Sequence, residues 1–168
     1  MDIQKQDITF PTKDGVFNMR VGAIIIRDGK VLMVKNNRDS YYYSVGGRVK
    51  LQETLEEAII RECFEETKVH FEVDRLVFIH ENFFPVQSGP FGETHFHEIS
   101  FFYLMKSNEV EVKVKCESYT SDGIEERLEW LPLSNLQDTF LFPEFFKSEL
   151  TCLPDEIKHI ATVEEKRT

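Results

Sequence analysis

Three neighbouring glutamates, Glu62, Glu65 and Glu66, are the residues best suited to chemistry. The apolar residues around them recur at three- and four-residue spacing without glycine or proline, at Leu55, Ala58, Ile59, Cys63 and Phe64. This pattern predicts an amphipathic helix between Glu53 and Lys68. On such a helix the three carboxylates project from one side and repel one another. They form either a solvated acidic face or a set of oxygen ligands through which Mg²⁺ bridges the protein to a phosphorylated ligand.

Two glycines, Gly46 and Gly47, precede the predicted helix by a short loop. Glycine lacks a β-carbon, so the backbone can approach a ligand closely here, and the Gly46 carbonyl is a candidate metal ligand. This context favours the metal-binding interpretation of the glutamates over the solvated acidic face.

The stretch that begins at these glycines, GGRVKLQETLEEAIIRECFEETKV, resembles the Nudix box. The box is usually written G-x5-E-x7-R-E-u-x-E-E-x-G-u, where u is a bulky aliphatic residue. Gly47 fills its leading glycine and Val69 its last position, and the charged positions are filled by Glu53, Arg61, Glu62, Glu65 and Glu66.

Three residues depart from the family pattern. Lys68 stands where the family has glycine, Cys63 where a larger aliphatic residue is preferred, and Val45 where a proline often precedes the two glycines. If the turn after the helix needs a positive φ, Lys68 is mildly strained there. No departure removes a metal ligand, so they bear on fine geometry and rate more than on the class of reaction.

The resemblance implies a role for each charged residue of the box. Glu62 and Glu66 are implied to be the main ligands of Mg²⁺ or Mn²⁺, with Glu65 as an additional or water-mediated ligand. Glu53 and Arg61 are implied to be a largely structural pair that ties the loop to the helix and orients the adjacent glutamate. The alternative for this pair is an ordinary exposed ion pair.

The implied reaction is attack of a metal-activated water on one phosphorus of a diphosphate, and it needs a general base. Family members take this base from the box or from a later strand or loop, and the candidates here are Glu98, Glu125 and Glu126. Glu98 is the first choice because it lies inside the apolar segment FHEISFFY, where a charge normally needs a cleft or a partner. A place on the solvent face of the strand is the alternative.

Phosphate contacts are predicted for Arg20 and Arg48, with Arg38 as a further candidate; for each, a solvated surface arginine is the alternative. Four phenylalanines around the loop after the box could stack on a base or ribose: Phe83, Phe84, Phe91 and Phe96. Phe84 is the choice among them, with a place in the core as the alternative. Pro85 lies sixteen residues beyond the box, a position similar to that in the ADP-ribose pyrophosphatase branch.

The sequence thus predicts a metal-dependent hydrolase that cleaves a diphosphate bond in a nucleoside diphosphate derivative such as ADP-ribose. A nucleoside triphosphate pyrophosphatase and a non-catalytic Nudix-like nucleotide sensor are the alternatives. The intact glutamates argue against the sensor, because a pure binder has no need of a self-repelling set. The isomerase that shares this fold expects a catalytic cysteine outside the box, and neither Cys116 nor Cys152 has a supporting context.

The remaining sequence predicts mostly strands. They are expected over residues 17–27, 30–35, 41–45, 71–84, 95–106, 110–114 and 127–133, and a C-terminal helix is expected from Pro143. The resemblance implies an α/β fold, a Nudix-type α/β/α sandwich with a mixed β-sheet and the box as a loop-helix-loop. One domain is expected over residues 1–168, with 1–14 and 155–168 flexible.

Composition limits the partners. A net charge of −10 and a pI near 5.0 argue against a surface that holds nucleic acid or anionic lipid. No apolar run approaches the roughly 18 residues of a membrane span, and the three cysteines show no C-x-x-C pairing. These features favour a cytoplasmic protein acting on a small molecule, and a homodimer is kept open beside a monomer.

Overall fold

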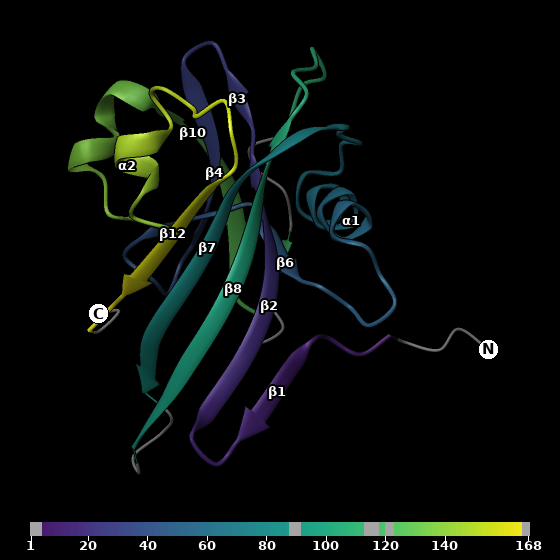
Figure 1. The fold of residues 1–168 in the computed structure, drawn as a ribbon. Helices are drawn as coiled ribbons and strands as arrows, with labels where there is room; N and C mark the ends of the chain where they lie inside the picture. The colour runs from purple at the N-terminus through teal and green to yellow at the C-terminus, as the bar shows by residue number, and fades with distance from the viewer. Residues whose placement is uncertain (1–4, 88–91, 113–117, 120–122, 166–168) are drawn as a thin grey trace.

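Two mixed β-sheets form the body of the protein in the computed structural model, which describes residues 5–87, 92–112, 118–119 and 123–165 (Figure 1). The first sheet has the strand order β1-β2-β8-β7-β12, with β6 paired to β2. Its strands are β1 (Thr9–Thr12), β2 (Gly15–Ile24), β6 (Gly46–Arg48), β7 (Val73–Gln87), β8 (Glu93–Met105) and β12 (Lys158–Val163). The pairs β2–β8 and β7–β12 are parallel, whereas β7 and β8 form a long antiparallel hairpin.

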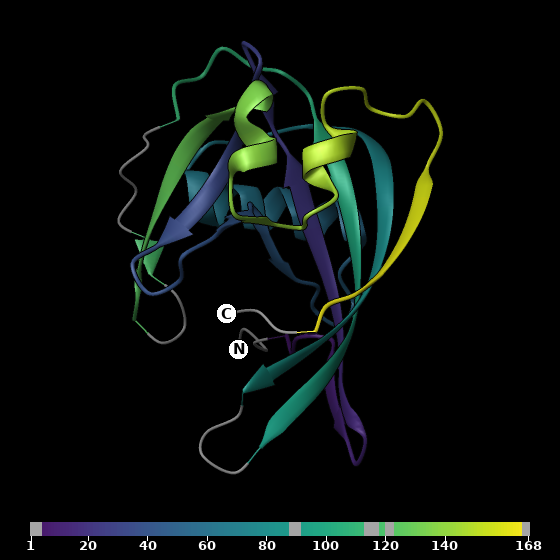
Figure 2. The same cartoon turned by 90° about the vertical axis from the view of Figure 1, so that its left-hand side faces the viewer.

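The second sheet has the order β11-β5-β4-β10-β9, with β3 paired to β4. Its strands are β3 (Ile26–Arg27), β4 (Lys30–Asn36), β5 (Tyr42–Ser44), β9 (Ser118–Tyr119), β10 (Glu125–Pro132) and β11 (Leu141–Phe142). The two sheets face each other, as Figure 2 shows. Strands far apart in the sequence therefore contribute side chains to the same interior.

The predicted helix is α1 (Leu55–Thr67), which lies against one side of the first sheet (Figure 1). Thr54 caps its start, because its hydroxyl accepts the Glu57 N–H while the Glu57 carboxylate accepts the Thr54 N–H. Ala58, Ile59 and Cys63 form its buried side. The helix ends at Lys68, whose φ of 60° confirms the positive φ expected at this turn.

Two apolar clusters hold the layers together. The first joins α1 to both sheets through residues such as Ile59, Val34 and Tyr103. The second lies under the 3₁₀ helix η2 (Leu133–Asp138) and the short helix α2 (Phe146–Glu149), around Phe78 and Phe146. Alternate residues of each strand face opposite sides, so one strand can serve both clusters. Helices on both sides of the sheets agree with the predicted α/β/α class.

Two expectations from the sequence are wrong. Residues 1–14 and 155–168 were expected to be flexible, but residues 9–12 form β1, which pairs with β2, and residues 158–163 form β12, which pairs in parallel with β7 along six residue pairs. Ile160 is the only apolar residue of β12 that is partly buried, since Ala161 and Val163 are exposed, so its sequence gives little sign of its partner. Residues 110–112 are not in a strand, and 113–114 lie outside the described residues. None of the helices in the described part of the chain has the length and apolarity that crossing a membrane requires.

Candidate active site

The box loop is fastened to α1 by the predicted pair Glu53 and Arg61. Arg61 donates to Glu53 through Nε at 2.6 Å and through Nη2 at 2.9 Å, and the Lys50 backbone N–H donates to the same carboxylate at 2.9 Å. Arg61 also donates to the Arg48 carbonyl at 3.1 Å. The hydrogen bond to Glu53, which is the largest cause, and a bond to Glu62 raise the pKa of Arg61 well above its usual value, although burial opposes the rise. The loop and the helix therefore form one unit.

Glu62 is positioned by Arg61 and by the backbone of Gly47. Arg61 Nη1 donates to Glu62 Oε1 at 2.6 Å. A β-carbon at Gly47 would come within 2.3 Å of Glu62 Oε2, so this position has no room for a side chain. Burial raises the pKa of Glu62, although the hydrogen bond from Arg61 opposes the shift. The carboxylate is thus partly desolvated and fixed in direction.

Glu66 is the carboxylate whose surroundings most clearly call for a bound cation. Its Oε2 atom is buried and has no hydrogen-bond partner among the residues that the structure describes. Burial raises the pKa of Glu66 well above its usual value, the charges of Glu126 and Glu62 add to the rise, and a hydrogen bond from the Gly46 backbone opposes it. An ionised carboxylate is costly in such surroundings unless a cation balances it. Buried carboxylate oxygens of this kind suit a hard divalent cation.

The other two predicted metal ligands are placed differently. Glu65 is about half exposed, with Arg61 Nη1 at 3.5 Å. Gly46 directs its N–H at Glu66, and it pairs with Gly22 in the β2–β6 ladder. Among the described residues, no three acidic, histidine or cysteine side chains already form a complete cation cage. Mg²⁺ does not need one, since it often takes only one or two carboxylates and completes its shell with water and substrate phosphate.

Glu126 reaches this site from β10. Its Oε1 accepts a short hydrogen bond from the Tyr43 hydroxyl of β5, and its charge acts on Glu66. Burial is the largest cause that raises the pKa of Tyr43 well above its usual value, and this hydrogen bond is the second largest. The phenol therefore stays protonated. Sequence reasoning missed Tyr43, because it lies 83 residues from Glu126.

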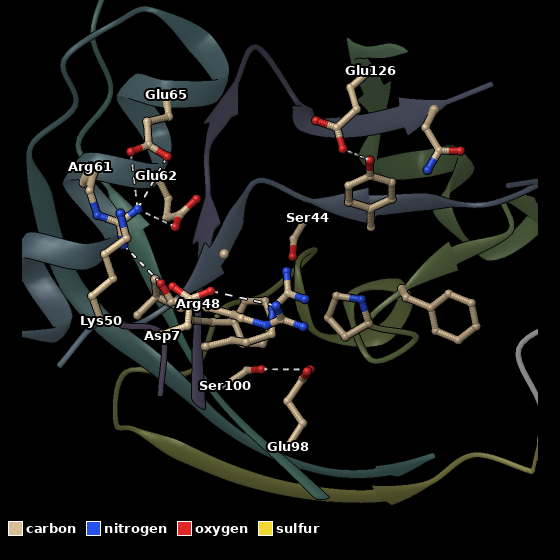
Figure 3. A pocket seen from close by; sticks show the side chains of 18 of the residues that line it. Asp7, Ser44, Arg48, Lys50, Arg61, Glu62, Glu65, Glu98, Ser100 and Glu126 are labelled. Carbon is tan, nitrogen blue, oxygen red and sulfur yellow. Dashed lines mark hydrogen bonds and ion pairs between the residues drawn. The ribbon is translucent and has the colours of Figure 1, made fainter. Parts of the chain in front are cut away.

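An open cavity of about 920 Å³ is lined by Tyr43, Gly47, Arg61, Glu62, Glu65 and Glu126 (Figure 3). Glu66 is not among its lining residues, but the charges of the lining residues Glu62 and Glu126 act on it. Six basic residues contribute to the wall of the cavity: Lys5, Arg20, Arg38, Arg48, Lys50 and Arg61. Arg20 acts on both box carboxylates, since its charge favours ionisation of Glu62 and Glu66. Arg48 lies 3.8 Å from Asp7, and its side chain is 44% exposed. The cavity thus combines a cation site with positive groups, a combination that suits phosphates.

Glu98 enters the same cavity from β8, on the side opposite Glu126 (Figure 3). It is only 8% exposed, and it accepts hydrogen bonds from Asn18 at 3.1 Å and Ser100 at 3.4 Å. The expected alternatives were a cleft and a solvent face, and the structure shows the cleft.

The family assignment rests on a sequence model: residues 16–150 match the model of the NUDIX domain. The match covers most of the chain and includes the whole box. This chain belongs to the Nudix family. The predicted Nudix hydrolase class and fold are thereby confirmed.

Relatives agree with this Nudix assignment. A MutT-like protein of Streptomyces ambofaciens is 31% identical over 80 residues, which are 47% of this chain and 50% of that protein. The chain thus matches about half the length of that relative.

Solved structures support the fold. A MutT protein from Bacillus halodurans superposes with a TM-score of 0.65 at 16% identity, over 88% of this chain and 90% of that one. An ADP-ribose pyrophosphatase from Streptococcus suis gives 0.53 at 14% identity, over 86% and 98%. At these identities the likeness concerns the fold alone.

The predicted stacking role of Phe84 is not supported by its position in this Nudix fold. Phe84 lies near the far end of the β7–β8 hairpin, which extends away from α1, and it does not line the cavity of the box (Figure 1). It is 7% exposed and stacks on Phe96 with ring centroids 5.3 Å apart. Phe91 lies outside the described residues. Distance along the chain placed these aromatics near the box, but the long hairpin carries them away.

The two described cysteines, Cys63 and Cys152, lend no support to the related isomerase. Cys63 is fully buried in α1, and this burial raises its pKa well above the usual value, as expected for a small apolar residue. Cys152 is exposed and does not line the cavity, and Cys116 lies outside the described residues.

Proposed function

We propose that this Nudix protein hydrolyses a diphosphate bond in a nucleoside diphosphate derivative such as ADP-ribose, with Mg²⁺ or Mn²⁺ as cofactor. The buried Oε2 of Glu66, which has no hydrogen-bond partner among the described residues, carries the proposal, because a cation bound beside Glu62 and Glu126, whose charges act on Glu66, would satisfy it. Residues 1–168 are proposed to act as one domain in which residues 16–150 supply the site.

Glu62 and Glu66 are proposed as the main cation ligands, and Glu65 is proposed to act through a water because it is more exposed. The bound cation would lower the pKa of a water and neutralise charge on the bridging phosphate oxygens. Arg61 and Glu53 keep Glu62 in place. The Gly46 carbonyl, predicted as a further ligand, is a weaker candidate because its own N–H is the group directed at Glu66.

Arg20 and Arg48 are proposed to bind the substrate phosphates and hold one phosphorus within reach of the attacking water. Glu126 is proposed to accept the proton of that water, in preference to Glu98, because it is the carboxylate whose charge acts on Glu66. Tyr43 holds Glu126 by donating its hydroxyl proton. The water oxygen bonds to phosphorus as the bridging P–O bond breaks, which leaves two phosphate monoesters.

The test compares the wild type with Glu66→Gln on ADP-ribose, dinucleoside polyphosphates and nucleoside triphosphates in Mg²⁺. Glu66→Gln keeps the shape of the side chain, and we expect kcat to fall at least about a hundredfold. Glu56→Gln, an exposed glutamate on the same helix, is the matched control and should retain activity. Mg²⁺ should raise the melting temperature of the wild type but not that of Glu66→Gln.

Product analysis separates the alternatives. Release of pyrophosphate from a nucleoside triphosphate, with ADP-ribose left intact, would favour the triphosphate pyrophosphatase. Binding of a nucleotide without turnover of any compound would favour the sensor. Equal activity of the wild type and Glu66→Gln would overturn the metal assignment.

A further inference from the structure

Glu98 is a buried carboxylate that three strands hold in position on the wall of the cavity. Asn18 of β2 donates to its Oε2 at 3.1 Å, and Ser100 of β8 donates to its Oε1 at 3.4 Å. Thr9 of β1 donates to the Asn18 side-chain oxygen at 2.6 Å, which fixes the amide nitrogen toward Glu98. Asn18 and Ser100 are themselves buried, with exposed fractions of 2% and 5%. Such an anchored acceptor is suited to recognition.

The charges of the cavity restrict what Glu98 can contact. It faces the box carboxylates and Glu126 from the opposite side of the cavity (Figure 3). A phosphate group carries negative charge and would be repelled by Glu98, whereas Arg20 and Arg48 attract it. The group that contacts Glu98 itself should therefore carry no negative charge and should be able to donate a hydrogen bond, although Arg20 lies nearby, opposite Ser100 in the β2–β8 ladder.

Apolar side chains line the same cavity as Glu98. Phe102 follows Glu98 on the same face of β8, and it lines the cavity together with Phe142 of β11. Tyr41 also lines it and packs edge-on against Phe142, with ring centroids 5.0 Å apart. Binding sites for small molecules commonly combine such apolar walls with a few fixed polar groups.

We propose that Glu98 is a specificity-determining residue that accepts hydrogen bonds from a neutral donor on the nucleoside part of the substrate. The donor is either a sugar hydroxyl or an amino group of the base, since both can bond to a carboxylate. The inference rests on the proposed function only in that the ligand is a nucleoside diphosphate. It assigns Glu98 to binding and away from the proton transfer expected for it from the sequence.

Calorimetric binding of hydrolysis-resistant analogues in Mg²⁺ tests this inference. The probes are α,β-methylene-ADP and methylenediphosphonate, which lacks the nucleoside. Glu98→Gln should weaken the binding of α,β-methylene-ADP at least about tenfold, because a charged acceptor is lost. It should bind methylenediphosphonate within about twofold of the wild type, which also shows that the variant is folded. Glu93→Gln, on the same strand but outside the cavity, is the matched control.

Modified nucleosides then identify the donor. If a sugar hydroxyl donates to Glu98, the 2′-deoxy or 3′-deoxy analogue should bind the wild type and Glu98→Gln with about equal affinity. If the amino group of the base donates to Glu98, the analogue that carries hypoxanthine should bind the two proteins with about equal affinity. Either result supports the proposal, because the effect of the substitution then disappears with the donor.

Other results would overturn it. If Glu98→Gln weakened the binding of both probes equally, Glu98 would lie at the phosphates. If the variant bound both probes as the wild type does but lost most of its kcat, Glu98 would be the general base. Failure of the wild type to prefer α,β-methylene-ADP over methylenediphosphonate would remove the nucleoside site. If binding depends on Glu98 but no compound is hydrolysed, the proposed function fails while this inference stands.

Discussion

Arg61 is the residue on which the geometry of the site depends most. It donates to Glu53, Glu62 and the Arg48 carbonyl, and these acceptors belong to both the loop and the helix. The planar guanidinium can make such bonds in fixed directions, which a lysine ammonium cannot. The pair Glu53–Arg61 is therefore structural, as the resemblance implied, and the side chain of Glu53 is only 9% exposed.

Glu53→Gln should make the melting temperature of the protein depend less on pH in the acidic range. Burial opposes ionisation of Glu53, but hydrogen bonds from Arg61 and Lys50 outweigh it and lower the pKa of Glu53 below its usual 4.5. A lowered folded-state pKa stabilises the protein above the unfolded pKa, and this contribution is lost as the pH falls through the folded value. The wild type should thus melt above Glu53→Gln at pH 7, and the difference should shrink below about pH 4.

Thermal melts of both proteins from about pH 7 to pH 3 measure this effect. Glu57→Gln is a useful comparison, because hydrogen bonds from Thr54 also lower the pKa of Glu57 but its carboxylate is exposed. Its effect on the melting temperature should be smaller. A constant difference between the wild type and Glu53→Gln across this range would contradict the ion-pair argument.

For single residues, the sequence predicted which charged residues of the box lie together, because they belong to one loop and the helix that directly follows it. It did not predict how Tyr43 holds Glu126, since that contact joins two strands of the folded sheet. It also placed Phe84 in the site, from which the length of the hairpin removes it.

Among the elements, α1 shows how local chemistry defines a helix. Thr54 and Glu57 start it with a capping box, and Lys68 ends it in the left-handed region with φ of 60°. For residues other than glycine, the left-handed conformation costs roughly 1–2 kcal/mol. The Lys68 ammonium recovers part of this cost by donating to the Glu65 carbonyl at 2.6 Å.

Lys68→Gly should therefore stabilise the protein by about 1 kcal/mol, measured as the free energy of unfolding in urea. Glycine adopts the positive φ without strain, and the bond it loses is exposed. Lys68→Ala is the control, since it loses the bond and keeps the strain, and it should be no more stable than the wild type. Destabilisation by Lys68→Gly would show that the bond to Glu65 outweighs the strain.

The helix and the strands expected over residues 17–27 and 30–35 could be predicted because their patterns are local. The strand β12 could not, because its partners in β7 lie about 80 residues earlier. Its inward positions are Ile160 and Thr162, and only the first is apolar. A polar inward residue gives no strand signal until its partner is known.

At the scale of the whole molecule, the site exists because two sheets and a helix meet. Glu62 and Glu66 come from α1, Arg20 and Glu98 from the first sheet, and Glu126 from the second. No single element could place these charges around one cavity. The first sheet must therefore keep its shape, and its last strand, β12, is an edge strand held in part by polar contacts.

Thr162→Val tests how far these polar contacts hold β12. The Thr162 hydroxyl donates to the Asn82 side-chain oxygen at 2.6 Å and lies 2.7 Å from His80 Nε2, which is placed to donate to it. His80 and Asn82 are buried, with exposed fractions of 4% and 1%. Valine keeps the shape of threonine but bonds to neither group, so each loses one partner in a place that water reaches poorly. We expect a loss of about 1–3 kcal/mol in the free energy of unfolding.

Urea denaturation of Thr162→Val measures this loss, and Thr151→Val, at an exposed threonine outside the sheets, should change stability by less than about 0.5 kcal/mol. Hydrogen exchange should show faster opening of β12 than of α1, because an edge strand has hydrogen-bond partners on one side only. If Thr162→Val were as stable as the wild type, the apolar contact of Ile160 and the backbone ladder to β7 would hold the strand by themselves. The polar contacts would then serve to set the register of β12 against β7, since a slip by one residue would turn Thr162 to the outer face.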